Sequence, residues 1–243
     1  MTSLLEVDGL SRRFGGVTAV DACSFAVEPG TITGLIGPNG SGKTTVFNLV
    51  TGYLAADSGS IAFAGSLVRR PDPSRLARAG LLRTFQQARV FPNLTVLENL
   101  ALAAPQPWWA GGRARVGREE RERGDELLAD FGLERLSSSP AAELSFGQRK
   151  LLEFAATLMG TPRLVLLDEP TAGVNAILVE AIERHIRRLH AAGLTFLVVE
   201  HDMPLVMRLC DPVIVLDHGS KLAEGPPAAM QSDPRVRDAY LGA

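Results

Sequence analysis

The stretch GPNGSGKTT at residues 37–45 is a glycine-rich loop between a β-like segment, TITGLIG, and a helical pattern, TTVFNLVTGYL. Its glycines allow backbone conformations that other residues resist, so successive N–H groups can point inward at phosphate oxygens. A helix that begins near Gly42 directs its positive end at the same anion. Lys43 is expected to reach the β- and γ-phosphates, and the Thr44 hydroxyl to ligate Mg²⁺. The predicted phosphate-binding residues are Gly37, Pro38, Asn39, Gly40, Ser41, Gly42, Lys43, Thr44 and Thr45.

A second motif, LVLLDEP, complements the loop. A hydrophobic strand that ends in Asp168 places a carboxylate at the edge of the sheet where open α/β folds bind their ligands. Asp168 is predicted to hold a metal through water, and Glu169 to polarise an attacking water. A strand-end Asp-Glu pair is also compatible with a solvated pair or a helix cap. Next to the glycine-rich loop, it predicts a site for a nucleoside triphosphate with Mg²⁺.

Strands and helices alternate along most of the chain. Uninterrupted apolar strands such as RLVLLDE and LTFLVVEH, separated by helical patterns, indicate an α/β fold with a parallel sheet covered on both faces. PVIVLDHGSKLAEG is predicted to form a closing hairpin. We expect one domain over residues 1–243, in which residues 1–87 and 160–243 form the α/β core. Residues 88–159 are expected to form an inserted helical subdomain.

The bulk composition narrows the class of protein. A content of 46% hydrophobic and 21% charged residues is typical of a soluble globular chain. The net charge of −2 gives no reason to expect nucleic acid as a partner. Cys23 and Cys210 are far apart in no metal-like spacing, which favours a reducing compartment. No apolar run approaches the ~18 residues of a membrane span, and no signal peptide is evident, so we expect a cytoplasmic protein.

The segment ELSFGQRKLLEFAATLM, residues 143–159, resembles the phosphate loop in having a glycine at the start of a helix. Ser145 stands where a helix N-cap should be, Gly147 allows close approach of a ligand, and the helix start is again an anion site. Taken alone, an ordinary Ser-capped helix explains the segment equally well. Because the glycine-rich loop already encloses the chain's own nucleotide phosphates, the second helix start is predicted to meet a nucleotide held by another chain.

Four motifs in order, GPNGSGKTT, LSFGQ, LLDEP and EHD, resemble those of the ATPase subunit of ABC transporters over essentially the whole chain. The resemblance implies a RecA-like P-loop NTPase fold with a mostly parallel core sheet, an N-terminal antiparallel β subdomain and an inserted α-helical subdomain. It implies ATP and Mg²⁺ as cofactors, and a head-to-tail dimer that sandwiches two ATP molecules. Across that dimer, Ser145 and Gly147 would contact the γ-phosphate, with Gln148 in the same turn.

Other positions follow from the same resemblance. Phe14 matches the aromatic residue that stacks on adenine, although a core phenylalanine is an alternative. Gln86 matches the glutamine that touches metal and water and links to the membrane subunit, and its neighbour Gln87 makes the assignment ambiguous. His201 matches the histidine that senses the γ-phosphate; a structural histidine is the alternative. Asn175 departs from the family, which usually has Asp at this position. The contact that this residue makes across the dimer is therefore expected to be weaker or to involve different partners.

The segments RTFQQARVFPNLTVLENL, EHDMPLVM and DPRVRDAYLGA are similar to the subunits of branched-chain amino-acid uptake systems, and urea and amide importers have related subunits. The implied partners are a second, identical or different, ATPase subunit, transmembrane permease subunits and, indirectly, a solute-binding protein. The implied location is the inner face of the plasma membrane. A soluble, non-transport ABC-type ATPase and a regulatory module without turnover are the alternatives. Trp108 and Trp109 suit either an exposed coupling patch or a buried anchor.

Overall fold

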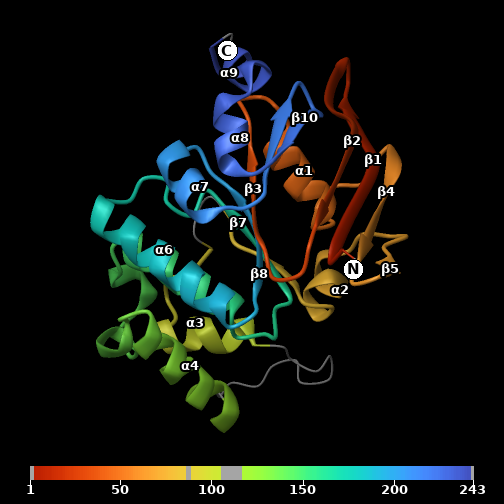
Figure 1. Ribbon diagram of the computed structural model, residues 1–243. Coiled ribbons are helices and arrows are strands. Elements are labelled where there is room, and N and C mark those ends of the chain that lie inside the picture. Colours follow the sequence, from red (N-terminus) through yellow and green to blue (C-terminus); the bar gives the residue numbers. More distant parts are fainter. Residues whose placement is uncertain (1–2, 86–88, 105–116, 242–243) are drawn as a thin grey trace. The chain divides into compact units, whose positions relative to one another are not determined.

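The computed structural model describes residues 3–85, 89–104 and 117–241 of the 243-residue chain. The chain divides into two compact units. Figure 1 labels their helices and strands, coloured along the sequence. The core unit comprises Met1–Arg83, Arg163–Glu169 and Arg187–Ala243, and the helical unit comprises Thr84–Pro162 and Pro170–Ile186. Gln86, Trp108 and Trp109 lie outside the described residues. Within the described ranges, no helix combines the length and the apolar composition needed to cross a bilayer.

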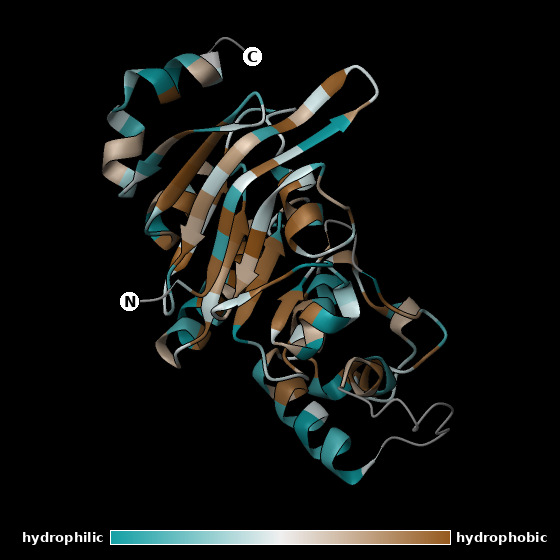
Figure 2. Ribbon diagram, turned by 90° about the vertical axis from the view of Figure 1, so that its right-hand side faces the viewer, coloured by the Kyte–Doolittle hydropathy of each residue, from teal (hydrophilic) through white to brown (hydrophobic). Residues whose placement is uncertain are grey.

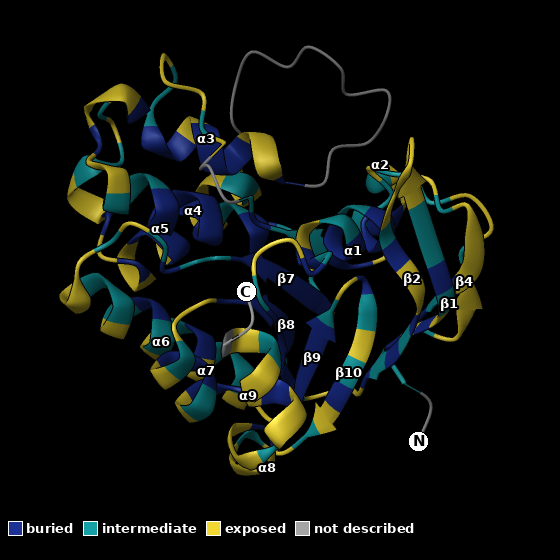
Figure 3. Cartoon of the chain, turned by 90° about the horizontal axis from the view of Figure 1, so that it is seen from above, coloured by how far each residue is buried: buried dark blue, intermediate teal, exposed yellow. Residues whose placement is uncertain are grey.

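The core unit contains a six-stranded sheet in the order β10-β9-β3-β8-β7-β6. All neighbouring pairs are parallel except β10 and β9, which form the predicted closing hairpin. Every residue of β3, β7 and β8 is buried, which explains why their sequences are continuously apolar (Figure 3). The strands are β3 (Ile32–Ile36), β6 (Leu81–Arg83), β7 (Leu164–Asp168), β8 (Thr195–Val199), β9 (Val213–Asp217) and β10 (Ser220–Gly225).

The order of this sheet decides where the functional residues meet. β3, β8, β7 and β6 are adjacent and parallel, so their carboxyl ends share one edge of the sheet. The glycine-rich loop follows β3, His201 follows β8, Asp168 ends β7 and Arg83 ends β6. The carboxyl edge is where ligands of open α/β sheets bind, so this edge is the candidate site.

A second, four-stranded antiparallel sheet of the core unit has the order β2-β1-β4-β5. Leu5 in its central strand pairs with Val27 on one side and Phe63 on the other, and all three side chains are buried. Figure 2 shows apolar and polar residues mixed along these strands, as expected for a sheet with one buried face. The expected N-terminal antiparallel sheet is thus confirmed. Its strands are β1 (Leu5–Phe14), β2 (Val17–Val27), β4 (Ser58–Phe63) and β5 (Ser66–Leu67).

The helices of the core unit include α1, which buries Val46, Phe47, Leu49 and Val50 in the hydrophobic core. Five short elements were not predicted from the sequence: β5, β6, α2 and the two C-terminal helices. These short segments lack the continuous apolar run or the adjoining motif by which β3, β7, β8 and α1 were recognised. The helices are α1 (Lys43–Val50), α2 (Pro73–Arg78), α7 (Met203–Leu209), α8 (Pro227–Ser232) and α9 (Pro234–Leu241).

In the helical unit, Phe131 stacks on His185 with ring centroids 4.2 Å apart and meets the edge of Phe154 at 5.3 Å. These rings tie α4, α5 and α6 together. The predicted boundaries of the insertion, 88–159, stay a prediction; the compact unit that holds these helices also includes residues 170–186. The helices are α3 (Val96–Ala103), α4 (Arg118–Asp130), α5 (Phe146–Thr157) and α6 (Ala176–Ala191, which continues into the core unit), with short turns η2 (Glu134–Leu136) and η3 (Ala141–Glu143).

Candidate nucleotide site

The phosphate loop presents backbone N–H groups to a ligand. Gly42, the N-cap of α1, has a left-handed φ of 98°, and a Cβ there would lie 2.5 Å from the carbonyl oxygen of Ala19 in β2. The position therefore requires glycine both for its conformation and for the close approach of β2. Among described residues no side chain caps α1. The first-turn N–H groups thus suit an external anion.

Lys43 reaches back into the loop that precedes it. Its side chain is buried, and Nζ donates hydrogen bonds to the carbonyl oxygens of Gly37 and Pro38, both at 2.8 Å. Burial lowers the pKa of the ammonium group, and the nearby carboxylates of Glu169 and Asp168 oppose this lowering. The structure thus places the Lys43 ammonium inside the loop, within the electrostatic range of both carboxylates.

Glu169 follows β7 in an unusual backbone conformation. Its φ of 49° is left-handed, a region that costs a non-glycine residue free energy and is common at functional sites. Its N–H donates to the carbonyl oxygen of Val199 at 2.9 Å, which ties it to the end of β8. The backbone thus holds Glu169 at the end of β7, next to the end of β8.

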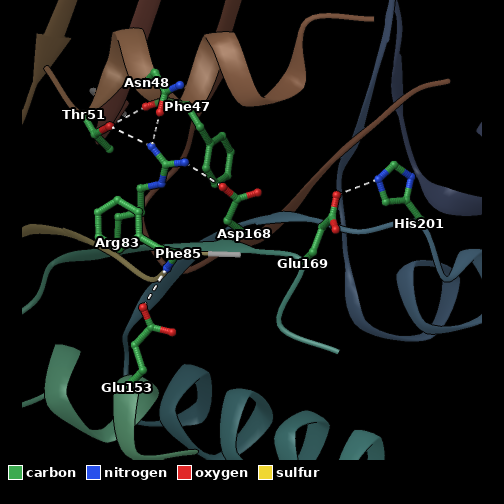
Figure 4. Close-up of polar contacts among 9 residues, drawn as sticks. All are labelled: Phe47, Asn48, Thr51, Arg83, Phe85, Glu153, Asp168, Glu169 and His201. Carbon is green, nitrogen blue, oxygen red and sulfur yellow. Dashed lines mark hydrogen bonds and ion pairs between the residues drawn. The ribbon is translucent and has the colours of Figure 1, made fainter. Parts of the chain in front are cut away.

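The Glu169 carboxylate meets His201. The distance between Oε1 of Glu169 and Nε2 of His201 is 2.8 Å (Figure 4). The Glu169 side chain is 15% exposed and the imidazole 42% exposed. With Nε2 protonated, the histidine donates to the carboxylate, and this contact fixes the direction of a carboxylate placed to accept a proton from water. Glu169 and His201, two of the three predicted catalytic residues, are therefore together in the core unit, and the third, Gln86, lies outside the described residues.

The oxygen donors at this edge fit Mg²⁺. The ion prefers hydroxyl, carboxylate and phosphate oxygens and usually takes only one or two protein ligands. Thr44 at the start of α1 is exposed and Asp168 ends β7. Within the described residues, no cluster of three or more His, Cys, Asp or Glu side chains could hold a metal by itself. The donor set suits an ion shared with nucleotide phosphates, and the predicted Mg²⁺ ligands stay a prediction. Gln86, the third predicted ligand, lies outside the described residues.

Phe14, predicted to stack on adenine, ends β1. Its ring is 46% exposed, so it is no core residue, and the guanidinium carbon of Arg12 lies 5.1 Å from the ring centroid. An exposed aromatic face in the same unit as the phosphate loop is the surface on which a base can stack. Its contact with adenine stays a prediction.

The Ser145 turn, residues 145–148, lies in the helical unit. Ser145 is the N-cap of α5, as predicted: its hydroxyl oxygen accepts the N–H of Gln148 at 3.3 Å, and the Gln148 side chain accepts the N–H of Ser145 at 2.9 Å. The Ser145 hydroxyl hydrogen remains able to donate to an anion, because the cap uses only the oxygen. A methyl group on Gly147 would meet the end of the Leu178 side chain, which would have to move to admit it.

Asn175, the departure from the family pattern, also lies in the helical unit. Its side-chain oxygen accepts the N–H of Leu178 at 3.0 Å, at the start of α6. Asparagine is as good as aspartate in this local role.

Sequence reasoning missed Arg83. It ends β6, its side chain is 6% exposed, and it forms an ion pair with Asp168 at 2.6 Å. The available signal was an arginine at the end of a short apolar segment, three residues before Gln86.

Comparison with known proteins gives a consistent result. A family model described as ABC transporter matches residues 20–172, and one described as branched-chain amino acid ATP-binding cassette transporter matches residues 220–243. The high-affinity branched-chain amino acid transport ATP-binding protein BraF of Pseudomonas aeruginosa is 37% identical to this chain over 98% of each. An ATP-binding cassette of an ABC transporter, solved in its ADP conformation, is similar with a TM-score of 0.90 and 34% identity over 100% of both chains. A cassette solved as a dimer with ADP and phosphate has a TM-score of 0.79 and 26% identity, covering 92% of this chain and 98% of its own.

Proposed function

Because the chain belongs to the family of ABC transporter ATP-binding proteins, in its branched-chain amino acid branch, we propose that it hydrolyses ATP in a head-to-tail pair to power uptake of branched-chain amino acids. The observation that carries the proposal is the contact between Glu169 and His201 at the edge of the sheet that also bears the phosphate loop. A carboxylate held by a histidine at a phosphate-binding edge supports the roles of a base and its orienting partner.

The residues of the core unit divide the chemistry of hydrolysis. The loop N–H groups and the Lys43 ammonium bind the phosphates and stabilise the charge that develops on the transferred group. Glu169 accepts the proton of the attacking water, and His201 holds the Glu169 carboxylate in place through the 2.8 Å contact. A bound Mg²⁺, held through Thr44, Asp168 and Gln86, would neutralise phosphate charge. Phe14 would stack on the base.

The partner of this chain would complete each site. The phosphate loop and the Ser145 turn belong to different compact units, and α5 is already capped by its own side chains. We infer that the Ser145 hydroxyl and the N–H groups at the start of α5 bind the γ-phosphate of an ATP held by the partner ATPase subunit. ATP then stabilises the closed pair. Hydrolysis reopens the pair, because ADP lacks the γ-phosphate that Ser145 contacts. The related cassette solved as a dimer with ADP and phosphate supports a paired arrangement.

A cavity of about 120 Å³ in the helical unit fits contact with the membrane subunits. Phe91 and Leu102 line it and are 58% and 55% exposed. Exposed apolar side chains beside a cavity are suited to receive an apolar group of another protein. We place the transmembrane permease there, which would hold this chain at the inner face of the plasma membrane. The cavity is lined by Arg89, Val90, Phe91, Asn99, Leu102, Ala103, Leu152, Glu153 and Ala156.

The test of hydrolysis is Glu169→Gln. Glutamine keeps the shape and an oxygen acceptor for His201 but cannot take the proton, so turnover is expected to fall roughly 10²-fold or more while ATP binding is kept. Phosphate release and binding of a fluorescent ATP analogue measure the two quantities. Turnover at the wild-type rate would refute the role of Glu169.

The solute is tested in the complex reconstituted with its permease in lipid. A binding protein loaded with leucine, isoleucine or valine is expected to stimulate ATP hydrolysis by the wild-type complex and not by the Glu169→Gln complex. Stimulation by a urea- or amide-loaded binding protein instead would assign the chain to the related importers.

A further inference from the structure

Arg83 connects three elements at the site edge of the core unit. Nη2 donates to Oδ2 of Asp168 at 2.6 Å, and Nη1 donates to Oδ1 of Asn48 at 2.7 Å and to the hydroxyl of Thr51 at 3.3 Å (Figure 4). The guanidinium carbon lies 5.5 Å from the centroid of the Phe47 ring. One buried cation at the end of β6 thus ties the end of β7 to α1.

The side of α1 that Arg83 binds is the side that carries Thr44. Residues 44, 48 and 51 are spaced i, i+4 and i+7, so they lie on one face of the helix. Arg83 binds the second and third of these residues, and its other nitrogen binds Asp168. The first residue of the face, Thr44, and the carboxylate of Asp168 are the two described candidates for holding Mg²⁺, Asp168 through water. Arg83 therefore contacts both the helix face that carries Thr44 and the Asp168 carboxylate itself.

We propose that Arg83 is a positioning residue that fixes the Asp168 carboxylate relative to the Thr44 face of α1, so that both oxygens are arranged for Mg²⁺ before the nucleotide binds. The proposal rests on the proposed function. Arg83 takes up one carboxylate oxygen, Oδ2, which sets the rotamer of Asp168. Partners that orient a ligating carboxylate typically change metal affinity 10- to 100-fold when they are removed.

The contacts of Arg83 depend on the forked shape of its guanidinium group. Two nitrogens of one planar group bind partners on two different elements, which the single nitrogen of lysine cannot reproduce. Lysine keeps the positive charge beside Asp168, so Arg83→Lys separates loss of geometry from loss of charge. Asn48→Ala keeps the ion pair and removes only the strong contact with α1.

The experiment measures binding of a fluorescent ATP analogue to the full-length chain while Mg²⁺ is titrated. For Arg83→Lys, we expect the Mg²⁺ concentration at half-maximal enhancement of binding to rise about 10-fold. Affinity measured in EDTA should stay within about twofold of wild type, because the phosphate loop is intact. Asn48→Ala should give a smaller rise, about threefold. Arg118→Gln, which removes an ion pair of 2.7 Å on the exposed face of α4, is the matched control and should change neither quantity.

The outcomes separate this inference from the proposed function. Wild-type protein that binds no nucleotide would refute the proposed function itself. Wild-type Mg²⁺ dependence in both Arg83→Lys and Asn48→Ala would overturn the role of Arg83 and leave the proposed function standing. An equal loss of affinity with and without Mg²⁺ would also overturn it, since that pattern means general damage. Thermal unfolding of each variant confirms that binding is measured on folded protein.

Discussion

The starts of α1 and α5 are two solutions to the same local problem. Both helices begin with N–H groups that the helix itself leaves unpaired. At α1 the N-cap is a glycine in a left-handed conformation, without a side-chain cap among the described residues. At α5 the N-cap is Ser145, which forms a reciprocal capping box with Gln148. One helix start has no side-chain cap and is open to an external anion, and the other is partly satisfied by its own side chains.

This difference fits two different roles. A helix start that lacks a cap gains most from a bound phosphate, so α1 suits the nucleotide that the chain itself holds. The start of α5 is stable without a ligand, because the capping box already satisfies part of it. It can meet and leave a phosphate without unfolding, which a pair that opens and closes requires. We therefore expect nucleotide binding to depend mainly on the start of α1 and closure of the pair on the start of α5.

The largest effects should come from damaging each helix start in turn. Lys43→Ala removes the cation of the phosphate loop and should reduce turnover about 10²- to 10³-fold, together with a loss of ATP affinity. Ser145→Arg should abolish turnover to a similar extent but leave ATP binding by the single chain intact. Phosphate release and analogue binding distinguish the two patterns. Equal loss of binding in both variants would contradict the division of roles.

Mixing the two variants tests whether the sites are shared between chains. A pair of one Lys43→Ala chain and one Ser145→Arg chain has one complete site, formed by Lys43 of the second and Ser145 of the first. With random pairing of two copies, about a quarter of the wild-type sites should return. Activity at the level of the separate variants at every mixing ratio would argue against sites made by two copies of this chain.

Much of the fold followed from local patterns. The apolar runs of β3, β7 and β8 are continuous because both faces of these strands are buried, and they identified a parallel sheet correctly. The structure and the family comparison confirm the predicted fold class and family. Strand order did not follow from sequence, because it depends on contacts between distant segments. β6, with three residues, gave no pattern of its own, although it brings Arg83 to the site.

Residues of the candidate site could be predicted from sequence where the chemistry requires a particular residue type at a particular spacing. The glycine-rich loop and the strand-end Asp-Glu pair are of this kind. Arg83 and Glu153 were missed, because their roles depend on burial and on partners far away in the sequence. An arginine before TFQQ and a glutamate inside a helix look like ordinary surface charges until the fold buries them. Contacts across the pair, such as those predicted for Ser145, stay predictions.

A further prediction concerns Glu153 in the middle of α5. Its carboxylate accepts the N–H of Phe85 at 3.0 Å (Figure 4) and the N–H of Arg89, so it binds the residues on either side of residues 86–88. Burial raises the pKa of Glu153 from 4.5 to about 7, although these hydrogen bonds and the charges of Lys150 and Arg89 lower it. The rise corresponds to a cost of about 3 kcal/mol for ionising this group in the folded state.

The sign of the pH dependence follows from the raised pKa. Between about pH 4.5 and 7 the folded state keeps the proton that the unfolded state has lost, so this group makes the free energy of unfolding fall as pH rises. Glu153→Gln should remove that fall, which urea unfolding at pH 5 and pH 8 measures. Glu126→Gln, in an exposed ion pair on α4, is the control and should keep the wild-type slope. An unchanged slope in Glu153→Gln would contradict the assignment.

The smallest effect tests whether capping and phosphate reading at Ser145 can be separated. Aspartate is as good an N-cap as serine, whereas alanine costs about 1 kcal/mol of stability. Ser145→Asp should therefore unfold like wild type, yet lower turnover about 10-fold or more, because its carboxylate repels the γ-phosphate. Ser145→Ala should lose both stability and turnover. Thr95→Ala, which removes the equivalent capping box of α3, should lose only stability. If Ser145→Asp turned over ATP at the wild-type rate, Ser145 would be a helix cap and nothing more, and the start of α5 would lose its distinction from any other capped helix.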